Sequence, residues 1–536
     1  RPADVGEEVT LCGWVQYLRQ DLFVIMRDFS GLAQILIPQD EVRLQVAVTF
    51  TISAIVNDSI LISVEILNVC RKLPFEIKDF VKKSESLRMQ YRYLDLRSSQ
   101  MQYNLRLRSQ LVMKMREYLC NVHGFVDVET PTLFKRTPGG AKEFVVPSRE
   151  PGRFYSLPQS PQQFKQLLMV AGIDRYFQLA RCYRDEGSKP DRQPEFTQVD
   201  IEMSFVDQAG IRGLIEGLVQ YSWPVEKDPV STPFPCITYE KAMKDYGVDK
   251  PDTRFAMKLM DISKTFHNTE IEFLKDALNQ PGGCIQAICI PDGAVSTADG
   301  ALKSPLNRLM PASAKQQLLQ MAQARPGDLL LISAGTQECR PLLGKLRLQC
   351  AELLEGSGVA VRDPSAFHFL WVVDFPLFLP KEEDPDQLES AHHPFTAPLP
   401  EDAHLLYSLP HKVRGQHYDL VLNGCEIGGG SIRIHKASDQ QHVLETILKE
   451  DPSLLSHLLE ALDSGAPPHG GIALGLDRFL SIIVGAPSIR DVIAFPKSFR
   501  GHDLMSRAPD FVSEDELKSY HIAVNWPAGD EGNQEK

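Results

Sequence analysis

The sequence predicts a multidomain protein of the α+β class, and three observations support this prediction. The chain has 536 residues, enough for several domains of roughly 100–200 residues each. Its first seventy residues are short runs rich in Val, Ile and Leu, whereas helical and strand patterns alternate from about residue 101. No apolar run reaches the roughly 18 residues that a membrane helix needs, so we expect no membrane-spanning segment.

Residues 1–70 predict a small β-barrel. Five runs have the composition and length of strands, namely Val9–Val15, Leu22–Arg27, Leu32–Ile37, Val46–Ile55 and Ile60–Val69. Five short strands favour a barrel of the OB type. Few turn-forming residues separate the first two runs, which is what we expect if residues are missing there.

Changes in composition divide the remainder of the chain. Residues 71–100 are charged and mixed, as expected of a hinge, and the tail 500–536 is polar. Residues 236–362 carry Pro-Gly-Gly, Pro-Asp-Gly and Pro-Gly turns, which predict a separate α+β domain inserted between two parts of one larger domain. The two parts of that larger domain are residues 101–235 and 363–499.

Charge and cysteine content exclude few functions. The net charge of −13 argues against a protein coated with positive charge, but a local basic face suffices to bind nucleic acid. The ten cysteines are scattered without the spacing of a zinc site, so we expect free thiols in a reducing compartment. The chain begins with Arg1 rather than Met, as expected if a targeting segment has been removed or if the sequence is truncated.

A helix is predicted to begin at Ser160-Pro161-Gln162. Ser suits the N-cap and Pro the first helical position, and Gln162 and Lys165 would then share one face. An ordinary surface helix would explain the same residues.

The segment from Arg192 to Glu202 predicts a strand with one polar face. Alternation places Gln198, Asp200 and Glu202 on one side and apolar residues on the other. Such a face is either exposed or forms the floor of a site for a polar ligand. A loop at residues 181–186 precedes it, and Arg184 and Arg192 suit phosphate recognition.

Two carboxylates flank a predicted hairpin. Asn423-Gly424 between apolar runs predicts a two-residue turn, which places Asp419 and Glu426 on the same face as diagonal neighbours. A shared Mg²⁺ carried by nucleotide phosphates would relieve their repulsion. A solvated face with Lys or Arg nearby would relieve it equally well.

A glycine-rich strand, Gly470 to Gly475, leads into an apolar helix that begins near Arg478. Small residues allow the backbone to approach a ligand closely, although glycine also serves plain packing.

Together, these segments resemble the three signature motifs of class II aminoacyl-tRNA synthetases. Residues 124–131, ending in Pro131, resemble motif 1, the dimer-interface element. The hairpin with Arg184 and Phe196 resembles motif 2, and Gly475 to Arg478 resembles motif 3. The runs at 159–162, 191–198, 391–394 and 428–433 are similar to aspartyl-tRNA synthetases of the bacterial and organellar type.

The resemblance implies an enzyme that activates L-aspartate with ATP and Mg²⁺ and transfers it to tRNA(Asp). It implies Arg184, Arg478 and Glu426 as catalytic residues and Asp419 and Glu426 as the metal ligands. The implied ATP site comprises Arg184, Glu186, Phe196, Glu426, Gly475, Leu476, Asp477 and Arg478. The implied aspartate site comprises Ser160, Gln162, Lys165, Arg184, Gln198, Asp200, His392, His393 and Arg433. Lys165 and Arg433 would bind the side-chain carboxylate.

The resemblance also implies a homodimer and a catalytic domain with an antiparallel sheet flanked by helices. It favours the mitochondrial matrix, with the bacterial cytoplasm as the alternative. Phe23 and Gln34 match anticodon readers, although a single aromatic such as Phe23 is usually barrel core. The chain departs from the family at Gly139, where a Glu is common.

Three alternatives remain at this point. The first is a non-catalytic RNA-binding protein, against which Arg184, Asp419, Glu426 and Arg478 argue. The second is an asparaginyl or lysyl enzyme, against which Lys165, Arg433 and the insertion argue. The third is an RNA-free adenylating enzyme, against which the N-terminal barrel argues.

Overall fold

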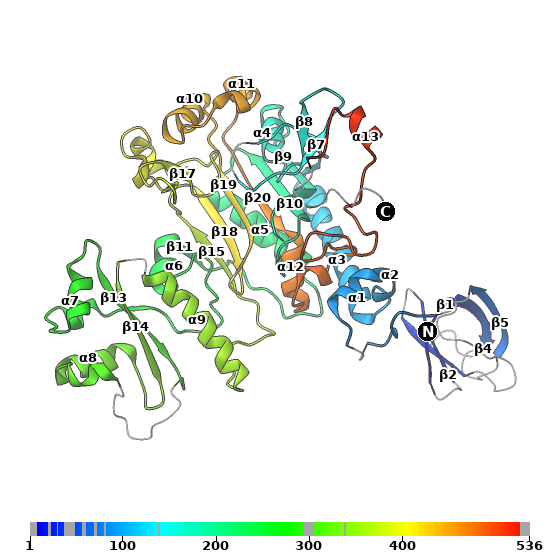
Figure 1. The fold of residues 1–536 in the computed structure, drawn as a ribbon, viewed down its shortest axis with the longest axis horizontal. Helices are drawn as coiled ribbons and strands as arrows, with labels where there is room; N and C mark the ends of the chain where they lie inside the picture. Colours follow the sequence, from blue (N-terminus) through cyan, green and yellow to red (C-terminus); the bar gives the residue numbers. More distant parts are fainter. Residues whose placement is uncertain are drawn as a thin grey trace. The chain divides into compact units, whose positions relative to one another are not determined.

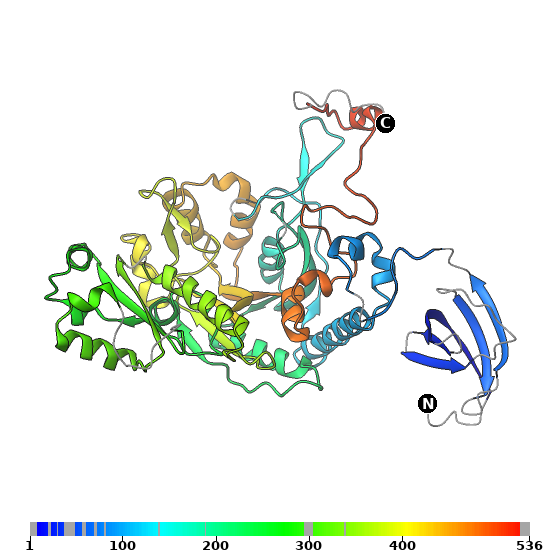
Figure 2. The ribbon, with the colours of Figure 1, turned by 60° about the horizontal axis from the view of Figure 1, so that its bottom comes forward.

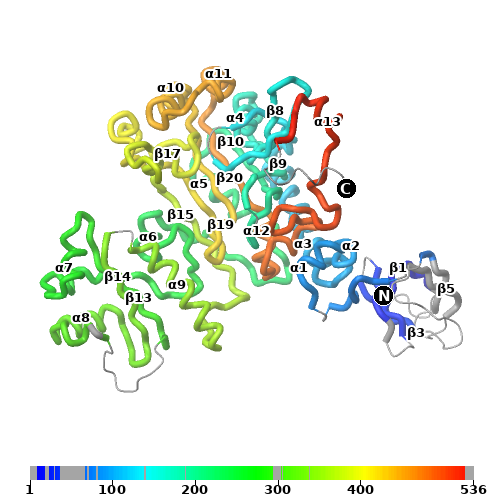
Figure 3. The backbone as a smooth tube through the Cα atoms, in the orientation of Figure 1, coloured from blue at the N-terminus to red at the C-terminus, as the bar shows by residue number. Residues whose placement is uncertain are grey.

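The computed structural model describes residues 8–19, 23–28, 31–36, 49–55, 61–68, 72–79, 82–137, 140–187, 189–293, 304–336 and 339–525. The chain forms two compact units (Figures 1 and 3). The first comprises Arg1–Ser109, Gly187–Gln193 and Pro487–Val512, and the second comprises Gln110–Glu186, Pro194–Ala486 and Ser513–Lys536. Within the described part of the chain, no helix combines the length and the apolar character required to cross a membrane.

The first unit contains a five-stranded antiparallel sheet, which confirms the five predicted strands. Its strands are β1 (Glu8–Arg19), β2 (Phe23–Arg27), β3 (Leu32–Leu36), β4 (Thr49–Ile55) and β5 (Leu61–Asn68), in the order β3-β2-β1-β4-β5. Val15, Val24 and Met26 are at most 2 % exposed and form the core side of this sheet. Alternate residues of the same strands therefore face the other side.

The same unit contains the hinge helices α1 (Glu85–Gln90) and α2 (Arg92–Asp95) and the start of α3 (Ser99–Glu117). Arg88 and Arg92 pair with Asp95, and Arg88 also pairs with Asp491 of the C-terminal segment. Arg92 donates to the carbonyl oxygens of Ala494, Arg490 and Ile493 as well. These bonds tie the hinge to a segment almost 400 residues later in the chain.

An eight-stranded sheet forms the centre of the second unit, in the order β11-β15-β18-β19-β20-β10-β9-β6. The predicted antiparallel arrangement holds for its six inner strands. The edge pairs β11–β15 and β6–β9 are parallel, so the sheet is mixed. Its strands are β6 (Val126–Asp127), β9 (Arg175–Tyr183), β10 (Glu195–Ser204), β11 (Cys236–Thr238), β15 (Phe369–Val373), β18 (His417–Leu422), β19 (Cys425–Ile432) and β20 (His469–Gly475).

Helices pack on both faces of this sheet. Helix α5 (Gln208–Ser222) lies on the face that carries Trp371, whose indole Nε1 donates to Glu216 of α5 at 2.9 Å. Helix α4 (Gln162–Val170) lies on the other face, where Lys165 reaches β10. Helix α12 (Leu476–Val484) continues directly from β20. Apolar side chains such as Val199, Ile201 and Leu420 are fully buried between these layers.

The inserted region forms a layer of its own within the second unit (Figure 2). A three-stranded sheet of β12 (Met260–Asp261), β13 (Cys284–Ile290) and β14 (Leu329–Gly335) packs with α7 (Glu272–Asn279), α8 (Ala312–Ala322) and α9 (Cys339–Gly356). The predicted boundary at residue 236 falls earlier than this sheet, because Cys236–Thr238 pair with β15 of the main sheet. Helix α6 (Tyr239–Tyr246) follows directly.

Smaller elements complete the chain. They include β7 (Val145–Pro147) with β8 (Phe154–Ser156), β16 (Phe378–Pro380) with β17 (Leu388–Ser390), α10 (Ala437–His442), α11 (Ser456–Asp463) and α13 (Glu514–Ser519). Two predictions of local structure are wrong. Helix α4 begins at Gln162 with Pro161 at its cap and no side-chain bond, so Ser160 does not cap it. Arg181–Tyr183 belong to β9 rather than to a loop, because they pair with β10.

Candidate active site

Strand register places the predicted site residues on one face of the main sheet. Asp419 pairs with Gly429, Gly429 with Ala473, and Ala473 with Asp200. Cross-strand partners share a face, so Asp419 and Asp200 lie on the same side, about 14 Å apart across three strand spacings. The residues between them are small, which leaves room for a ligand above the sheet. The predicted polar face of β10 is therefore covered rather than exposed, since Asp200 and Glu202 are fully buried.

Four charged side chains are buried together at one end of this face. Lys165 Nζ lies 2.9 Å from Asp200 Oδ1 and 3.5 Å from Glu202 Oε2, and Arg433 Nε lies 3.0 Å from Glu202 Oε1. None of the four is more than 4 % exposed. Two cations and two carboxylates balance in charge, which makes their burial tolerable.

Sequence reasoning placed Glu202 on this face but gave it no role. Burial acts to raise its pKa, yet Arg433 and Lys165 outweigh burial and the pKa is lowered. Glu202 therefore remains an anion that orients Arg433 through two hydrogen bonds. A signal for this arrangement was present in the glycine-rich strand, because a Cβ on Gly471 would lie 2.1 Å from Glu202 Oε2.

The first residues of α4, the helix that carries Lys165, line a cavity of about 310 Å³, and Ser160, Gln162, Arg184, Glu186, His392 and His393 are among its lining residues. Gln162 Nε2 and Arg184 Nε are buried and lack hydrogen-bond partners among the described residues. Buried polar groups are normally paired, so these two donors indicate a polar ligand. The Arg184 guanidinium lies 5.1 Å from the centre of the Phe196 ring.

Three histidines, His392, His393 and His417, lie in or next to the lining of the cavity. The rings of His392 and His417 stack at 3.6 Å, and His417 Nε2 lies 2.7 Å from Asp419 Oδ1. Burial lowers the pKa of His392, His393 and His417 to about 3, so all three are neutral. His392 and His393 were predicted from resemblance, whereas His417 was missed because only the fold brings it beside them.

The Asn-Gly hairpin is confirmed, with Asn423 and Gly424 at φ 52° and 80°. A bulge between Leu420 and Val421 shifts the pairing, so Asp419 faces Gly429. A Cβ on Gly429 would lie 2.7 Å from Asp419 Oδ1 and 3.5 Å from Glu426 Oε1. The two carboxylates therefore converge above this glycine, as the hairpin predicted.

Electrostatics at this pair suit a cation. Burial raises the pKa of Asp419 to about 6, and burial together with Asp419 raises the pKa of Glu426. The described residues contain no group of three or more metal-binding side chains. Two carboxylates suit Mg²⁺ that arrives with phosphates and keeps its other ligands. Lys250, which was not predicted, lies 4.0 Å from Glu426.

The glycine-rich strand ends at the predicted nucleotide residues Gly475 and Leu476, where α12 begins. Arg478 Nη1 donates to the carbonyl oxygen of Glu426 at 2.7 Å. Asp477 is buried, and its carboxylate accepts from the backbone N–H of Thr197 at 2.8 Å, which fixes the helix start to β10. Gln198 lies on the same face as Asp200, and Cys182 donates to its Oε1 at 3.2 Å.

The segment that follows Gly139 contains one carboxylate, that of Glu143. Glu143 accepts from the backbone N–H of Thr137 and from Gln159 Nε2, and it is not among the residues that line the cavity. Pro138 and Gly139 lie outside the described residues, so the departure at Gly139 stays a sequence observation.

Comparison with known proteins agrees with this geometry. Residues 84–499 match the family of class II tRNA synthetases (D, K and N). The mitochondrial aspartate–tRNA ligases of Rattus norvegicus and Homo sapiens are both 61 % identical, over 99 % and 98 % of this chain and 89 % and 90 % of their own.

The chain belongs to the class II tRNA synthetases. Within that family it groups with the aspartate–tRNA ligases. An aspartate–tRNA(Asp/Asn) ligase of Opitutus terrae is 40 % identical over 98 % of both chains. The fold of this synthetase matches the asparaginyl-tRNA synthetase of Pyrococcus horikoshii complexed with asparaginyl-adenylate, with a TM-score of 0.59, 18 % identity and coverage of 93 % and 96 %.

Proposed function

We propose that this synthetase activates L-aspartate with ATP, forming aspartyl-adenylate and pyrophosphate, and then transfers aspartate to the 3′ end of tRNA(Asp). The observation that supports this most directly is the pair of buried cations, Lys165 and Arg433, together with the cavity that Arg184 and the first turn of the Lys165 helix line. Once Asp200 pairs with the substrate ammonium group, Lys165 and Arg433 can pair with a substrate carboxylate, which a neutral amide could not replace.

Recognition of aspartate divides between the two ends of the substrate. Lys165 and Arg433 bind the side-chain carboxylate, with Glu202 holding the Arg433 fork in place. Asp200 attracts the ammonium group, and Gln162 and Ser160 contribute polar contacts from the cavity wall. His392 and His393 remain neutral there, so they add hydrogen-bonding groups without adding charge.

The activation step is an attack by the aspartate α-carboxylate on the α-phosphorus of ATP, with pyrophosphate as the leaving group. No protein nucleophile is required, because positioning and charge neutralisation lower the barrier. Arg184 and Arg478 neutralise the phosphates, Phe196 stacks on the base, and Glu186 contacts its amino group. Gly475, Leu476 and Asp477 fix the backbone beside the nucleotide. Asp419 and Glu426 would hold Mg²⁺, which supplies further phosphate neutralisation.

We assign the five-stranded sheet to anticodon binding as an OB barrel. The strand order β3-β2-β1-β4-β5 is that of an OB barrel opened between β3 and β5. Phe23 pairs with Leu36 and lies on the face opposite Val24 and Met26. This placement supports a role for Phe23 outside the core that Val24 and Met26 form. Gln34 is exposed on the same face as Phe23.

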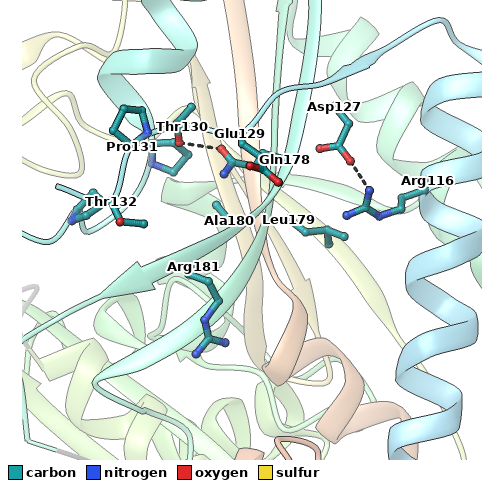
Figure 4. Close-up of a pocket in the computed structure, with 12 residues that line it drawn as sticks. Arg116, Asp127, Glu129, Thr130, Pro131, Thr132, Gln178, Leu179, Ala180 and Arg181 are labelled. Carbon is teal, nitrogen blue, oxygen red and sulfur yellow. Dashed lines mark hydrogen bonds and ion pairs between the residues drawn. The ribbon is translucent and has the colours of Figure 1, made fainter. Parts of the chain in front are cut away.

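The second copy of a homodimer would dock at the β6 edge of the main sheet. A pocket of about 520 Å³ lies there, lined by Arg116, Thr130, Pro131, Gln178 and Arg181 among others (Figure 4). Thr130 donates to Gln178 at 2.8 Å, and Arg116 pairs with Asp127. Val126 and Leu133 are 47 % and 48 % exposed beside it. An open strand edge with exposed apolar side chains suits pairing with an identical edge.

The mitochondrial relatives support a mitochondrial matrix location for this synthetase, with the bacterial cytoplasm as the alternative. We propose the domain roles that the sequence predicts: anticodon binding by 1–70, a hinge at 71–100, catalysis by 101–235 and 363–499, an insertion at 236–362 and a tail at 500–536.

The test is ATP–pyrophosphate exchange with each of the twenty amino acids, followed by charging of purified tRNA(Asp) and tRNA(Asn). We expect exchange with aspartate alone and charging of tRNA(Asp). Exchange with asparagine or lysine instead would overturn the proposal. Exchange without charging of any tRNA would leave an adenylating enzyme.

A further inference from the structure

Lys250 lies in a short segment that leads from helix α6 into the inserted region. Helix α6 ends at Gly247, whose left-handed backbone, with φ at 68°, closes the helix. A Cβ on Gly247 would lie 2.2 Å from the carbonyl oxygen of Arg340 in α9, so α6 and α9 are in close contact (Figure 1). The position of the chain is therefore fixed shortly before Lys250.

The chain is fixed again shortly after Lys250. Asp252 is buried and accepts hydrogen bonds from the backbone and the side chain of Arg254. A Cβ on Gly424 would lie 2.9 Å from the Cβ of Asp252, and the fully buried Arg347 of α9 donates to the carbonyl oxygen of Asp252 at 2.9 Å. The inserted region therefore holds this segment against the hairpin of β18 and β19, which carries the carboxylate pair.

The ammonium group of Lys250 lies close to the carboxylate pair without a hydrogen bond to it. Its Nζ lies 4.0 Å from Glu426 Oε2 and 3.8 Å from Asp249 Oδ2. Both distances exceed the roughly 2.7–3.2 Å of an N–H···O hydrogen bond, so neither ion pair occupies a donor of the ammonium group. The side chain is 48 % exposed, so a ligand that enters from solvent can reach it.

The carboxylate pair also marks where the terminal phosphates of ATP would lie. Mg²⁺ in nucleotide sites bridges oxygens of the β and γ phosphates, and Asp419 and Glu426 are the proposed ligands of that metal. A cation 4.0 Å from Glu426 is therefore within reach of the same phosphates. Burial raises the pKa of both carboxylates and Lys250 acts to lower it, as expected of a cation near the pair.

We propose that Lys250 is a further substrate-binding residue, which binds the β and γ phosphates of ATP and then the pyrophosphate that leaves. In the activation step an oxygen of the aspartate α-carboxylate bonds to the α-phosphorus, and the bond from the α-phosphorus to its bridging oxygen breaks. The electron pair of that bond passes to pyrophosphate, and Lys250 neutralises part of the charge that develops there. The proposal rests on the adenylation reaction proposed above, and it gives the inserted region a role in that reaction, which is to hold this lysine at the site.

The experiment measures equilibrium binding of ATP and of AMP, each with Mg²⁺, to the full-length wild-type chain and to the variants Lys250→Met and Lys250→Arg. We expect about tenfold weaker binding of ATP to Lys250→Met, most of it recovered in Lys250→Arg. Binding of AMP, which lacks the β and γ phosphates, should not change. In pyrophosphate exchange with aspartate, the KM values for ATP and for pyrophosphate should rise in Lys250→Met, while the KM for aspartate stays the same.

The matched control is Lys241→Met, which removes a lysine of α6 that is 57 % exposed and hydrogen-bonds Asp245 at 2.9 Å. It should leave the binding of both nucleotides unchanged. Unchanged or tighter binding of ATP to Lys250→Met would overturn the proposal, because Lys250 would then only neutralise Glu426. An equal loss of ATP and AMP binding would also overturn it, because the effect would not be confined to the terminal phosphates. A wild-type chain that binds ATP in this way but shows no exchange with aspartate would instead overturn the proposed function.

Discussion

Two ionic clusters in this synthetase each combine two cations with two carboxylates, but their hydrogen bonding differs. In the first unit, Arg88 and Arg92 meet Asp95 and Asp491, and the donors of Arg92 end on Asp95 and three backbone carbonyls. In the second unit, Lys165 and Arg433 meet Asp200 and Glu202.

The difference lies in hydrogen-bond saturation. Within the described residues, neither Arg88 nor Arg92 has an unpaired buried nitrogen, whereas both oxygens of Asp200 lack a hydrogen bond of good geometry beyond the Lys165 ion pair. Gln162 and Arg184 nearby also have unpaired donors. A cluster whose bonds are complete holds the fold together, and one whose bonds are incomplete is suited to a ligand.

The largest effect should come from breaking the saturated cluster. Arg92→Leu leaves three carbonyls unpaired and Asp95 with Arg88 alone, so we expect the free energy of unfolding to fall by about 3–5 kcal/mol. Urea unfolding measures this loss, and the KM for aspartate in the folded fraction should not change. Lys518→Gln, at an exposed pair with Asp515, is the control and should not move the midpoint. A wild-type midpoint for Arg92→Leu would erase the distinction between the clusters.

Breaking the unsaturated cluster should affect activity most. Arg433→Leu removes the guanidinium that Glu202 orients and leaves Lys165 as the only cation for the substrate carboxylate. The lower kcat/KM for aspartate should correspond to a loss of about 2–5 kcal/mol in transition-state stabilisation. Pyrophosphate exchange across an aspartate titration measures it, with Arg433→Lys as the variant that keeps the charge. Near-normal exchange in the Leu variant would contradict the assigned role.

The carboxylate pair extends the comparison to a cluster with an excess of negative charge. Lys250 lies 4.0 Å from Glu426, and within the described part of the chain no arginine side chain forms an ion pair with Asp419 or Glu426. Asp419→Ala or Glu426→Ala should raise the Mg²⁺ concentration needed for half-maximal exchange by about 10- to 100-fold. Wild-type magnesium curves in both variants would show that the pair binds no metal.

We expect the smallest effects from substitutions of two neighbouring glutamines on α4, which differ in their hydrogen bonding. Gln163 is saturated, since it donates to Thr137 Oγ1 and its Oε1 bonds His457, whereas Gln162 Nε2 is unpaired. Gln162→Ala should raise the KM for aspartate, by a factor that corresponds to about 0.5–1.5 kcal/mol of binding free energy, with little change in the melting temperature. Gln163→Ala should show the reverse. Identical behaviour of the two variants would mean that saturation does not predict function here.

Sequence patterns predicted local features well and distant pairings poorly. The turn at Asn423 and Gly424 and the strands of the first sheet follow from local residue preferences. The bulge between Leu420 and Val421 does not, because those residues have no local preference that marks it. Glu202 was assigned no role because its partner Arg433 lies 231 residues away.

Resemblance supplied roles that pattern alone could not. No local sequence pattern marks His392, His393 or Gln162 as binding residues. The structure brings them together because all three line one cavity. His417 and Lys250 lie outside the motifs and were therefore missed. Ser160 was assigned to the cap of α4 from a common sequence preference, but the helix begins later.

The close contacts of Gly471 restrict which nucleotide substitutions its codon can tolerate. A Cβ at this position would lie 2.1 Å from both the carbonyl oxygen of Ile201 and Glu202 Oε2, so any other residue must separate β20 from β10 and displace the anion that holds Arg433. Every glycine codon has the form GGN, and each change of its first or second base encodes something other than glycine. Only third-base changes are silent, so two of the three nucleotides of this codon should be intolerant of substitution.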